Sequence, residues 1–212
     1  ASVPAVHVIV LAFNGRDDVL RCLQWVLATD YPRLTVLLVD NASADDTVDA
    51  VTRRFPHCRI LRNPRNLGFG AGCNEGIKQA LDAGDDLVLL INPDTVASPA
   101  MVGQLSAFMQ QHPAAAIVGP KTLSTQPMPD GRAKLLYAGA WRRKLPLQQH
   151  VPGIERADEG EPAMPSQVDY VWGHAMMIRA EALRRIGLFD PAFFMYYEDL
   201  DLCRRVQAAG YE

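Results

Sequence analysis

The chain has 212 residues, which is enough for one sizeable hydrophobic core, and its 49% hydrophobic and 21% charged residues are ordinary values for a globular protein. A formal net charge of -3, without a dense basic stripe, gives no reason to expect a nucleic-acid partner. No apolar run approaches the roughly 18 residues of a membrane span. The four cysteines are scattered without CxxC spacing, so we expect free thiols in a reducing cytoplasm.

The first hundred residues alternate apolar runs with amphipathic segments. Continuous apolar runs such as "VHVIVLAFN" are typical of parallel strands that are buried on both faces. We predict strands at residues 6–14, 34–40, 58–63 and 87–91. We predict helices at residues 17–27, 43–55 and 70–83, and a further helix that Ser98 and Pro99 open. This alternation predicts an α/β fold with a mostly parallel central sheet and helices on both faces.

Polar residues follow the predicted strands at the point where each strand ends. These residues are Asn14, Asp40, Asn63 and Asp94. In open α/β sheets, ligands bind beyond the carboxyl ends of the strands, near the point where the strand order reverses. We therefore expect the four side chains to gather on one ligand-binding rim.

The second half of the chain differs in character. Residues 122–167 are rich in Pro and charge, so we predict a long loop there. A strand at 168–179, a short helix that ends at Gly187 and a final helix follow. We expect two halves of one domain, residues 1–100 and 101–212, and expect the natural protein to continue beyond the last residue.

Two segments can be explained either by local structure alone or by a role in ligand binding. Asp40 in "VDNASADDT" either makes local bonds in a turn or reads the ring N–H of uracil or thymine. The glycine-rich segment "RNPRNLGFGAGCNEG" suits the approach of phosphates to a helix N-terminus, but it is neither a P-loop nor GxGxxG. Arg65 and Asn66 within it are polar ligands or solvated loop residues.

The carboxylates of two further segments can likewise have either a local structural role or a role in binding or catalysis. Asp94 in "INPDT" either caps a type I turn or binds a hard divalent cation, which often takes one or two carboxylates plus substrate phosphates. Glu198 and Asp199 open the last helix, where negative charge offsets the helix dipole. Five bulky residues precede them, so a carboxylate there can have a raised pKa and act as general base. Asp201 can pair with Arg205 four residues on.

Taken in order, six segments resemble glycosyltransferases of family 2, in particular the rhamnosyltransferase-like branch. They are "VIVLAFNG", "LLVDNASADDT", "NLGFGAGCNEGI", "LLINPDT", "WGHAMMIRAEAL" and "GLFDPAFFMYYEDLDLCRR". The resemblance implies a GT-A-type domain that binds a nucleotide-diphospho-sugar in its first half and an acceptor in its second half. It also implies inverting transfer.

The resemblance also implies roles for individual residues. Asp199 matches the catalytic base, and Asp94 matches the acid that holds Mg²⁺ or Mn²⁺ on the diphosphate. Residues matching the nucleotide-sugar site are Phe13, Asn14, Asp40, Arg65, Asn66, Asn92 and Asp94. Residues matching the acceptor site are Trp172, Gly173, His174 and Glu198. Asn92 stands where Asp-x-Asp relatives carry their first acid, and Trp172 and His174 are bulkier than the small residues common at these positions.

The implied reaction builds a polysaccharide or a lipid-linked glycan. We expect dTDP-rhamnose as donor, with UDP-hexose or UDP-galactofuranose as less favoured donors, and a cytoplasmic enzyme that can work at the inner face of the cytoplasmic membrane. Two different classes of protein also share features of this sequence: a non-catalytic or truncated sugar-nucleotide-binding module and a nucleotidyltransferase. "AFNGRDD" lacks the phosphate loop that a nucleotidyltransferase would need after its first strand.

Overall fold

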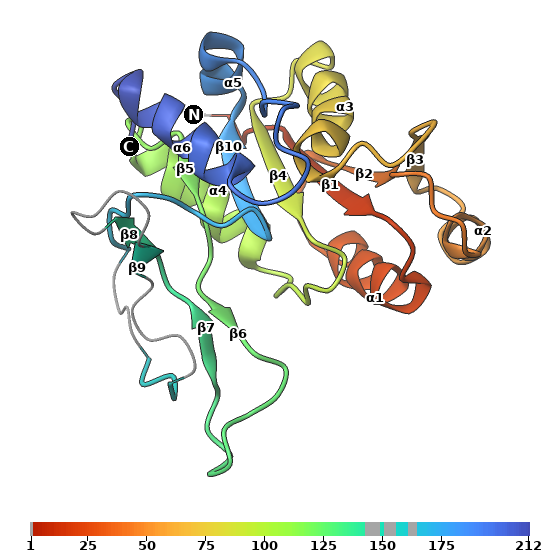
Figure 1. The fold of residues 1–212 in the computed structure, drawn as a ribbon, viewed down its shortest axis with the longest axis horizontal. Helices are drawn as coiled ribbons and strands as arrows, with labels where there is room; N and C mark the ends of the chain where they lie inside the picture. The colour runs from red at the N-terminus through yellow and green to blue at the C-terminus, as the bar shows by residue number, and fades with distance from the viewer. Residues whose placement is uncertain (1, 143–148, 151–155, 161–164) are drawn as a thin grey trace.

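A computed structural model describes residues 2–142, 149–150, 156–160 and 165–212. Its centre is a six-stranded sheet with strand order β3-β2-β1-β4-β10-β5 (Figure 1). The strands are β1 (Val6–Ala12), β2 (Leu34–Asp40), β3 (Arg59–Arg62), β4 (Leu87–Ile91), β10 (Ala175–Arg179) and β5 (Ile117–Val118). The strands from β3 to β4 are parallel, whereas β10 is antiparallel to both of its neighbours. The predicted mostly parallel α/β sheet is confirmed.

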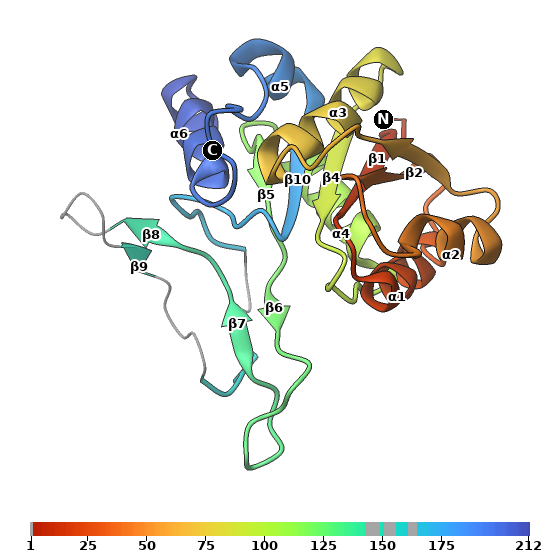
Figure 2. The same ribbon diagram turned by 45° about the vertical axis from the view of Figure 1, so that its right-hand side comes forward.

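Helices cover both faces of the sheet (Figure 2). They are α1 (Arg16–Leu27), α2 (Thr47–Arg54), α3 (Phe69–Asp82), α4 (Met101–Gln111), α5 (Ala180–Ile186) and α6 (Glu198–Ala208). Alternate residues of β1 explain the two layers: Val8 and Val10 pack in one core cluster with residues of α1, α2 and α4. Ile9 packs in the other, with residues of α3, α5 and α6. Every strand between the layers must therefore be apolar on both faces.

Residues 122–167, which we predicted as a loop, contain short strands. The antiparallel pairs are β6 (Thr122–Leu123) with β7 (Leu135–Tyr137), and β8 (Trp141–Arg142) with β9 (Gln149–His150). The β6–β7 pair projects away from the sheet (Figures 1 and 2). The sequence signals of a loop are nevertheless understandable, because none of these strands exceeds three residues.

Two helix starts and one strand differ from the predicted bounds. We predicted that α2 starts at Ser43, but Asp46 is its N-cap, because Ser43 Oγ instead accepts the N–H of Asn14 at 2.8 Å. The helix after Pro99 starts only at Met101. The strand predicted at 168–179 is regular only from Ala175 onward.

All four cysteines are free thiols, as predicted. None of the helices in the described residues has the length and hydrophobicity that a membrane-spanning helix needs.

Candidate active site

The sheet brings several of the predicted site residues to one edge. Chain order reverses between β1 and β4, which lie side by side and parallel, so their carboxyl ends meet at the same edge. The antiparallel strand β10 begins there too, because Ala175 pairs with Ile91 at the end of β4. The residues before β10 therefore lie next to the "NPD" turn after β4.

Asp40 ends β2 as a fully buried carboxylate. Its Oδ1 accepts the N–H of Ser43 at 3.1 Å. This is the local hydrogen bond that a purely structural role of Asp40 in the turn predicts. Its Oδ2 is buried without a hydrogen bond, although it forms an ion pair with Arg62 Nε at 3.6 Å, which is beyond hydrogen-bond distance. An unsatisfied buried carboxylate oxygen is costly, so Asp40 has an unused acceptor that a ligand N–H could satisfy.

Asn41 organises the loop between β3 and α3. Its Nδ2 donates to Asn66 Oδ1 at 2.8 Å and to Gly68 O at 3.0 Å. Its Oδ1 accepts from Asn63 Nδ2 at 3.0 Å and from the Leu67 N–H at 3.1 Å. Asn41 was not among the predicted site residues, although its place beside Asp40 at a strand end was a usable signal. Asn66 consequently has its carbonyl oxygen occupied within this network.

The other residues predicted for the nucleotide edge have different surroundings. Phe13 is 52% exposed, immediately after β1. Asn14 has a left-handed backbone, with φ of 61°, and its Oδ1 accepts the Ala44 N–H at 2.8 Å. Asn14 therefore ties the β1 turn to the loop after β2. Arg65 is exposed, and no ion pair fixes it within the described chain.

The "NPD" turn is connected to the segment before β10. The Asn92 N–H donates to His174 O at 2.8 Å, so the two segments are joined through the backbone. Asp94 is exposed at the turn. Burial raises the pKa of Cys22 to about 12, and the charge of Asp94 adds to that increase, which places Asp94 within electrostatic reach of this thiol.

An aromatic cluster lies beside this turn. The ring of Tyr137 lies 4.7 Å from that of Trp172 and 5.6 Å from that of His174. The His174 Nε2 and the Thr122 Oγ1 are 2.6 Å apart. Burial lowers the pKa of His174, and the negative charge of Asp94 partly offsets this decrease. The imidazole is therefore mainly neutral at neutral pH. Tyr137 and Thr122 come from β7 and β6 and were not predicted as site residues.

Asp199, in the first turn of α6, is held by two backbone donors. Its Oδ2 accepts the Gly173 N–H at 3.0 Å, and its Oδ1 accepts the Leu200 N–H at 2.7 Å. Burial raises the pKa of the Asp199 carboxyl above its ordinary value, and these hydrogen bonds oppose the increase. A carboxylate with a raised pKa and a fixed orientation can accept a proton from a hydroxyl group.

Glu198 has a different environment from its neighbour. Only 6% of it is exposed, and its Oε2 is buried without a hydrogen-bond partner. A Cβ at Gly70 of α3 would lie 3.4 Å from the Glu198 Cβ, so Glu198 packs near this helix. Burial raises the pKa of Glu198, and the charge of Asp199 adds to the increase. A role of Glu198 at the acceptor stays a prediction.

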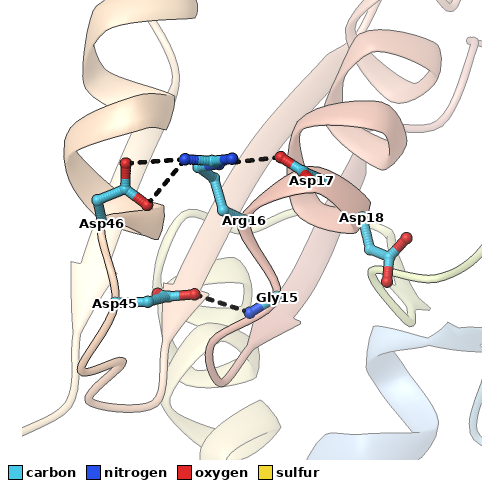
Figure 3. A pocket seen from close by; sticks show the side chains of 6 residues that line it. All are labelled: Gly15, Arg16, Asp17, Asp18, Asp45 and Asp46. Carbon is cyan, nitrogen blue, oxygen red and sulfur yellow. Dashed lines mark hydrogen bonds and ion pairs between the residues drawn. The ribbon is translucent and has the colours of Figure 1, made fainter.

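A separate hollow of about 380 Å³ lies near the carboxyl ends of β1 and β2 (Figure 3). Figure 3 shows Arg16 between two carboxylates, with Nε 2.9 Å from Asp17 and Nη1 3.2 Å from Asp46. Asp45 accepts the Gly15 N–H at 3.0 Å. Four carboxylates line this hollow, and they would repel a diphosphate. None of the predicted site residues lines it.

The structure places three of the four predicted acceptor residues, Trp172, Gly173 and His174, in one segment beside Asp199, whereas Glu198 packs near α3. Gly173 contacts Asp199, and Trp172 and His174 belong to one aromatic cluster that borders Asn92 through the backbone. Within the described residues, no group of three or more His, Cys, Asp or Glu side chains could hold a metal ion.

Solved structures resemble this fold. The mannosyltransferase PcManGT from Pyrobaculum calidifontis, in complex with GDP-Man and Mn²⁺, superposes with a TM-score of 0.68 at 18% identity and covers 99% of this chain and 53% of that one. S. aureus TarS in complex with UDP gives a TM-score of 0.66 at 18% identity, over 95% of this chain and 54% of that one. At this identity the likeness shows the fold alone, which is the predicted GT-A type.

Sequence comparisons identify the family. Residues 7–187 match the family described as Glycosyl transferase family 2. The chain is 34% identical over 199 residues to N-acetylglucosaminyl-diphospho-decaprenol L-rhamnosyltransferase of Mycobacterium tuberculosis (strain ATCC 25618 / H37Rv), over 87% of this chain and 64% of that protein. It is 27% identical over 214 residues to the rhamnosyltransferase WbbL of Escherichia coli (strain K12), over 95% of this chain and 77% of that protein.

The fold is that of a GT-A domain, built around a strand-end rim with an oriented carboxylate beside it. The chain belongs to glycosyl transferase family 2. The resemblance to the rhamnosyltransferase-like branch is confirmed by the relatives above. The chain spans less than two thirds of the length of the mycobacterial relative.

Proposed function

We propose that this chain carries the catalytic domain of an inverting glycosyltransferase that moves a sugar from a nucleotide-diphospho-sugar to an acceptor hydroxyl. The observation that carries the proposal is the geometry of Asp199. Two backbone N–H groups orient this carboxylate, burial raises its pKa, and an aromatic cluster lies beside the residues that hold it. Family membership supports the same reaction class.

In this proposal Asp199 accepts the proton of the acceptor hydroxyl as that oxygen attacks the anomeric carbon. The new bond forms on the face opposite the nucleotide, the bond from the anomeric carbon to the diphosphate oxygen breaks, and the nucleoside diphosphate leaves. One displacement inverts the anomeric configuration. A correctly placed base contributes about 10²- to 10⁴-fold to such a step.

The donor would lie across the carboxyl ends of β1, β2 and β4. There Asp40 offers an unused buried oxygen to the base, and Phe13, Asn14, Arg65 and Asn66 border the nucleotide. We propose dTDP-rhamnose as donor, because two relatives are named rhamnosyltransferases. The acceptor would be a glycan or a lipid-linked glycan, as the name of the mycobacterial relative indicates for that protein.

A divalent cation fits the residues at the "NPD" turn. Asp94 is exposed and, within the described chain, no Lys or Arg pairs with it, so its oxygens are free for a hard cation that substrate phosphates also bind. Asp94 would hold such a cation, with Asn92 nearby to contact ribose or diphosphate. The cation would stabilise negative charge on the leaving diphosphate as a Lewis acid.

The test combines a donor panel with two variants of the first turn of α6. Transfer from dTDP-rhamnose, UDP-glucose and UDP-galactofuranose is measured with Mn²⁺, and donor binding is measured by thermal shift. Asp199→Asn should reduce transfer about 10²- to 10⁴-fold and keep donor binding. Asp201→Asn removes a carboxylate that pairs with Arg205 at 2.8 Å and serves as the matched control. Wild-type transfer by Asp199→Asn would contradict the assignment, and binding without turnover in the wild type would indicate a binding module.

A further inference from the structure

Four consecutive large apolar side chains are exposed just before α6. The exposed fractions are 57% for Phe194, 53% for Met195, 74% for Tyr196 and 54% for Tyr197. Single exposed apolar residues are normal on a protein surface, but a contiguous exposed run indicates an interaction site. We call residues 194–197 the aromatic ridge.

The backbone of the aromatic ridge is strained. Tyr196 and Tyr197 have φ of 69° and 70°, so two successive residues with side chains adopt the left-handed conformation. This conformation is unfavourable for residues that carry a side chain, because Cβ comes too close to the following carbonyl oxygen. Strain of this kind persists only where the surrounding structure enforces it, and it concentrates at functional sites.

The surrounding structure does enforce the conformation of the ridge. The Phe69 N–H at the start of α3 donates to Phe194 O at 2.9 Å. A Cβ at Gly68 would lie 2.2 Å from the same carbonyl oxygen, so only glycine allows this approach. At the other end, the Asp201 N–H donates to Tyr197 O at 2.9 Å. The ridge is therefore fixed at both ends.

The aromatic ridge leads directly into the proposed base. Tyr197 is the N-cap of α6, and Asp199 is the second residue of that helix. Asp199 accepts the Gly173 N–H at 3.0 Å, and the neighbouring Trp172 donates from Nε1 to the Tyr170 hydroxyl at 3.4 Å, so the ridge leads to a carboxylate that is held beside the aromatic cluster.

We propose that Tyr196 and Tyr197 form a stacking surface for a sugar ring of the acceptor and position its hydroxyl group at Asp199. This inference rests on the proposed transferase function and adds an acceptor subsite to it. A tyrosine ring offers an apolar face to the C–H face of a sugar and a polar hydroxyl to its edge. A fixed backbone suits this role, since the acceptor hydroxyl must be placed accurately relative to the base.

Charge argues against an anionic lipid surface as the occupant. Residues 188–203, which contain the ridge, include Asp190, Glu198, Asp199 and Asp201 but no Lys or Arg. Surfaces that bind anionic lipids carry clusters of basic residues. A neutral sugar ring has no such requirement.

The test uses direct binding as well as turnover. Saturation-transfer NMR with p-nitrophenyl glycosides of N-acetylglucosamine, glucose, galactose and mannose identifies which rings the wild type contacts. Tyr196→Leu and Tyr197→Leu should weaken the best glycoside about 5- to 20-fold and raise its KM, whereas Tyr196→Phe keeps the ring and stays within about 2-fold of wild type. Thermal shift with the donor should not change. Trp25→Leu, on α1 and 39% exposed, is the matched control.

Several outcomes would overturn the inference. They are wild-type glycoside affinity in both Leu variants, equal losses in Tyr196→Phe and Tyr196→Leu, or contact between the wild type and none of the glycosides. A fourth is that the Leu variants no longer float with phosphatidylglycerol vesicles but bind the glycosides as the wild type does, which would indicate a membrane contact. If the Leu variants behave as expected but Asp199→Asn transfers sugar at the wild-type rate, the sugar subsite stands and the proposed base is wrong.

Discussion

The Gly173 N–H donates a hydrogen bond to Asp199 Oδ2 at 3.0 Å, and this contact joins two elements that are distant in sequence. Gly173 lies in the segment before β10, which is tied by the His174 carbonyl to the "NPD" turn after β4. Asp199 lies in the first turn of α6. The contact therefore fixes the proposed base relative to the end of the sheet where we place the donor.

Gly173→Ala tests this relationship. An added Cβ would lie 3.0 Å from Phe69 Cε1 and 3.7 Å from Asp199 Cβ, so either the Phe69 ring or the Gly173 backbone must shift. A shift of the Gly173 backbone would loosen its hydrogen bond to Asp199. We expect kcat to fall about 10- to 100-fold with little change in donor affinity, measured by initial rates and calorimetry.

A second substitution tests whether the loss of kcat in Gly173→Ala comes from the contact between the new Cβ and the Phe69 ring. Phe69→Leu removes the ring atoms that the new Cβ would meet, so the double variant should recover most of the lost kcat. Phe69→Leu alone provides the matched background. Additive losses in the double variant would show that crowding against Phe69 is not the reason for the loss.

The sheet could be predicted from the sequence because its strands are apolar on both faces and because turn residues separate them. The rim could also be predicted, since parallel strands place Asp40 and the "NPD" turn at the same edge. The tertiary contacts could not be predicted from the sequence. The bond between Asn41 and Asn66 joins residues 25 positions apart, and Asn74 binds the Phe189 carbonyl 115 positions away. No local pattern encodes such pairs.

The conformation of the residues before α6 was also outside the reach of sequence reasoning. The run of bulky residues was visible and predicted an aromatic wall, but two tyrosines in left-handed backbone contradict local preference. The close approach of Gly68 to Phe194 explains one glycine of the glycine-rich segment, for which the sequence suggested only a phosphate-binding role. The predicted pairing of Asp201 with Arg205 is confirmed at 2.8 Å, because helical spacing alone determines it.

Asp40→Asn should weaken nucleotide binding selectively. The variant keeps the shape of the side chain and removes the charge that would accept the ring N–H of uracil or thymine. A hydrogen bond to a charged group contributes about 1.5–3 kcal/mol, so we expect the Kd of UDP or dTDP to rise about 10- to 100-fold by calorimetry. CDP, which lacks this ring N–H, should change much less.

The matched control for Asp40 is Asp49→Asn, an exposed carboxylate in the first turn of α2. It changes the net charge equally without touching Asp40. An equal loss of affinity in both variants would assign the effect to overall charge. Unchanged UDP and dTDP affinity in Asp40→Asn would remove Asp40 from the base site.

Glu198→Gln should stabilise the protein at neutral pH. Burial raises the folded-state pKa of Glu198 above its unfolded value, so the stability that its protonated form contributes is fully present below the unfolded pKa. That stability is lost as the pH rises through the folded pKa. Gln resembles the protonated form at every pH. The variant should therefore gain about 1–3 kcal/mol at pH 8 and progressively less toward pH 4.

Thermal unfolding from pH 4 to pH 8 measures this difference, and about 1 kcal/mol corresponds to about 2–4 °C in Tm for a chain of this size. Two other titratable groups face Glu198: Asp199 on the same helix, which also titrates, and the Cys73 thiol of α3, whose pKa burial raises far above this pH range. Both are present in wild type and variant, so their contributions largely cancel. A variant that is less stable than wild type at pH 8 would show that Glu198 is a charged, satisfied group.

Asp94→Ala should remove the metal-dependent part of donor binding. Asp94 is exposed at the end of the "NPD" turn, and within the described chain it has no competing cationic partner. Mg²⁺ and Mn²⁺ are commonly held by one or two carboxylates together with substrate phosphates, so one carboxylate is a large share of the protein's ligands. Donor Kd measured with Mn²⁺ and again with EDTA should differ in the wild type and converge in the variant. Asp190→Ala, an exposed carboxylate before the aromatic ridge, controls for the lost charge. If Asp94→Ala keeps the wild-type difference between Mn²⁺ and EDTA, the cation is bound elsewhere.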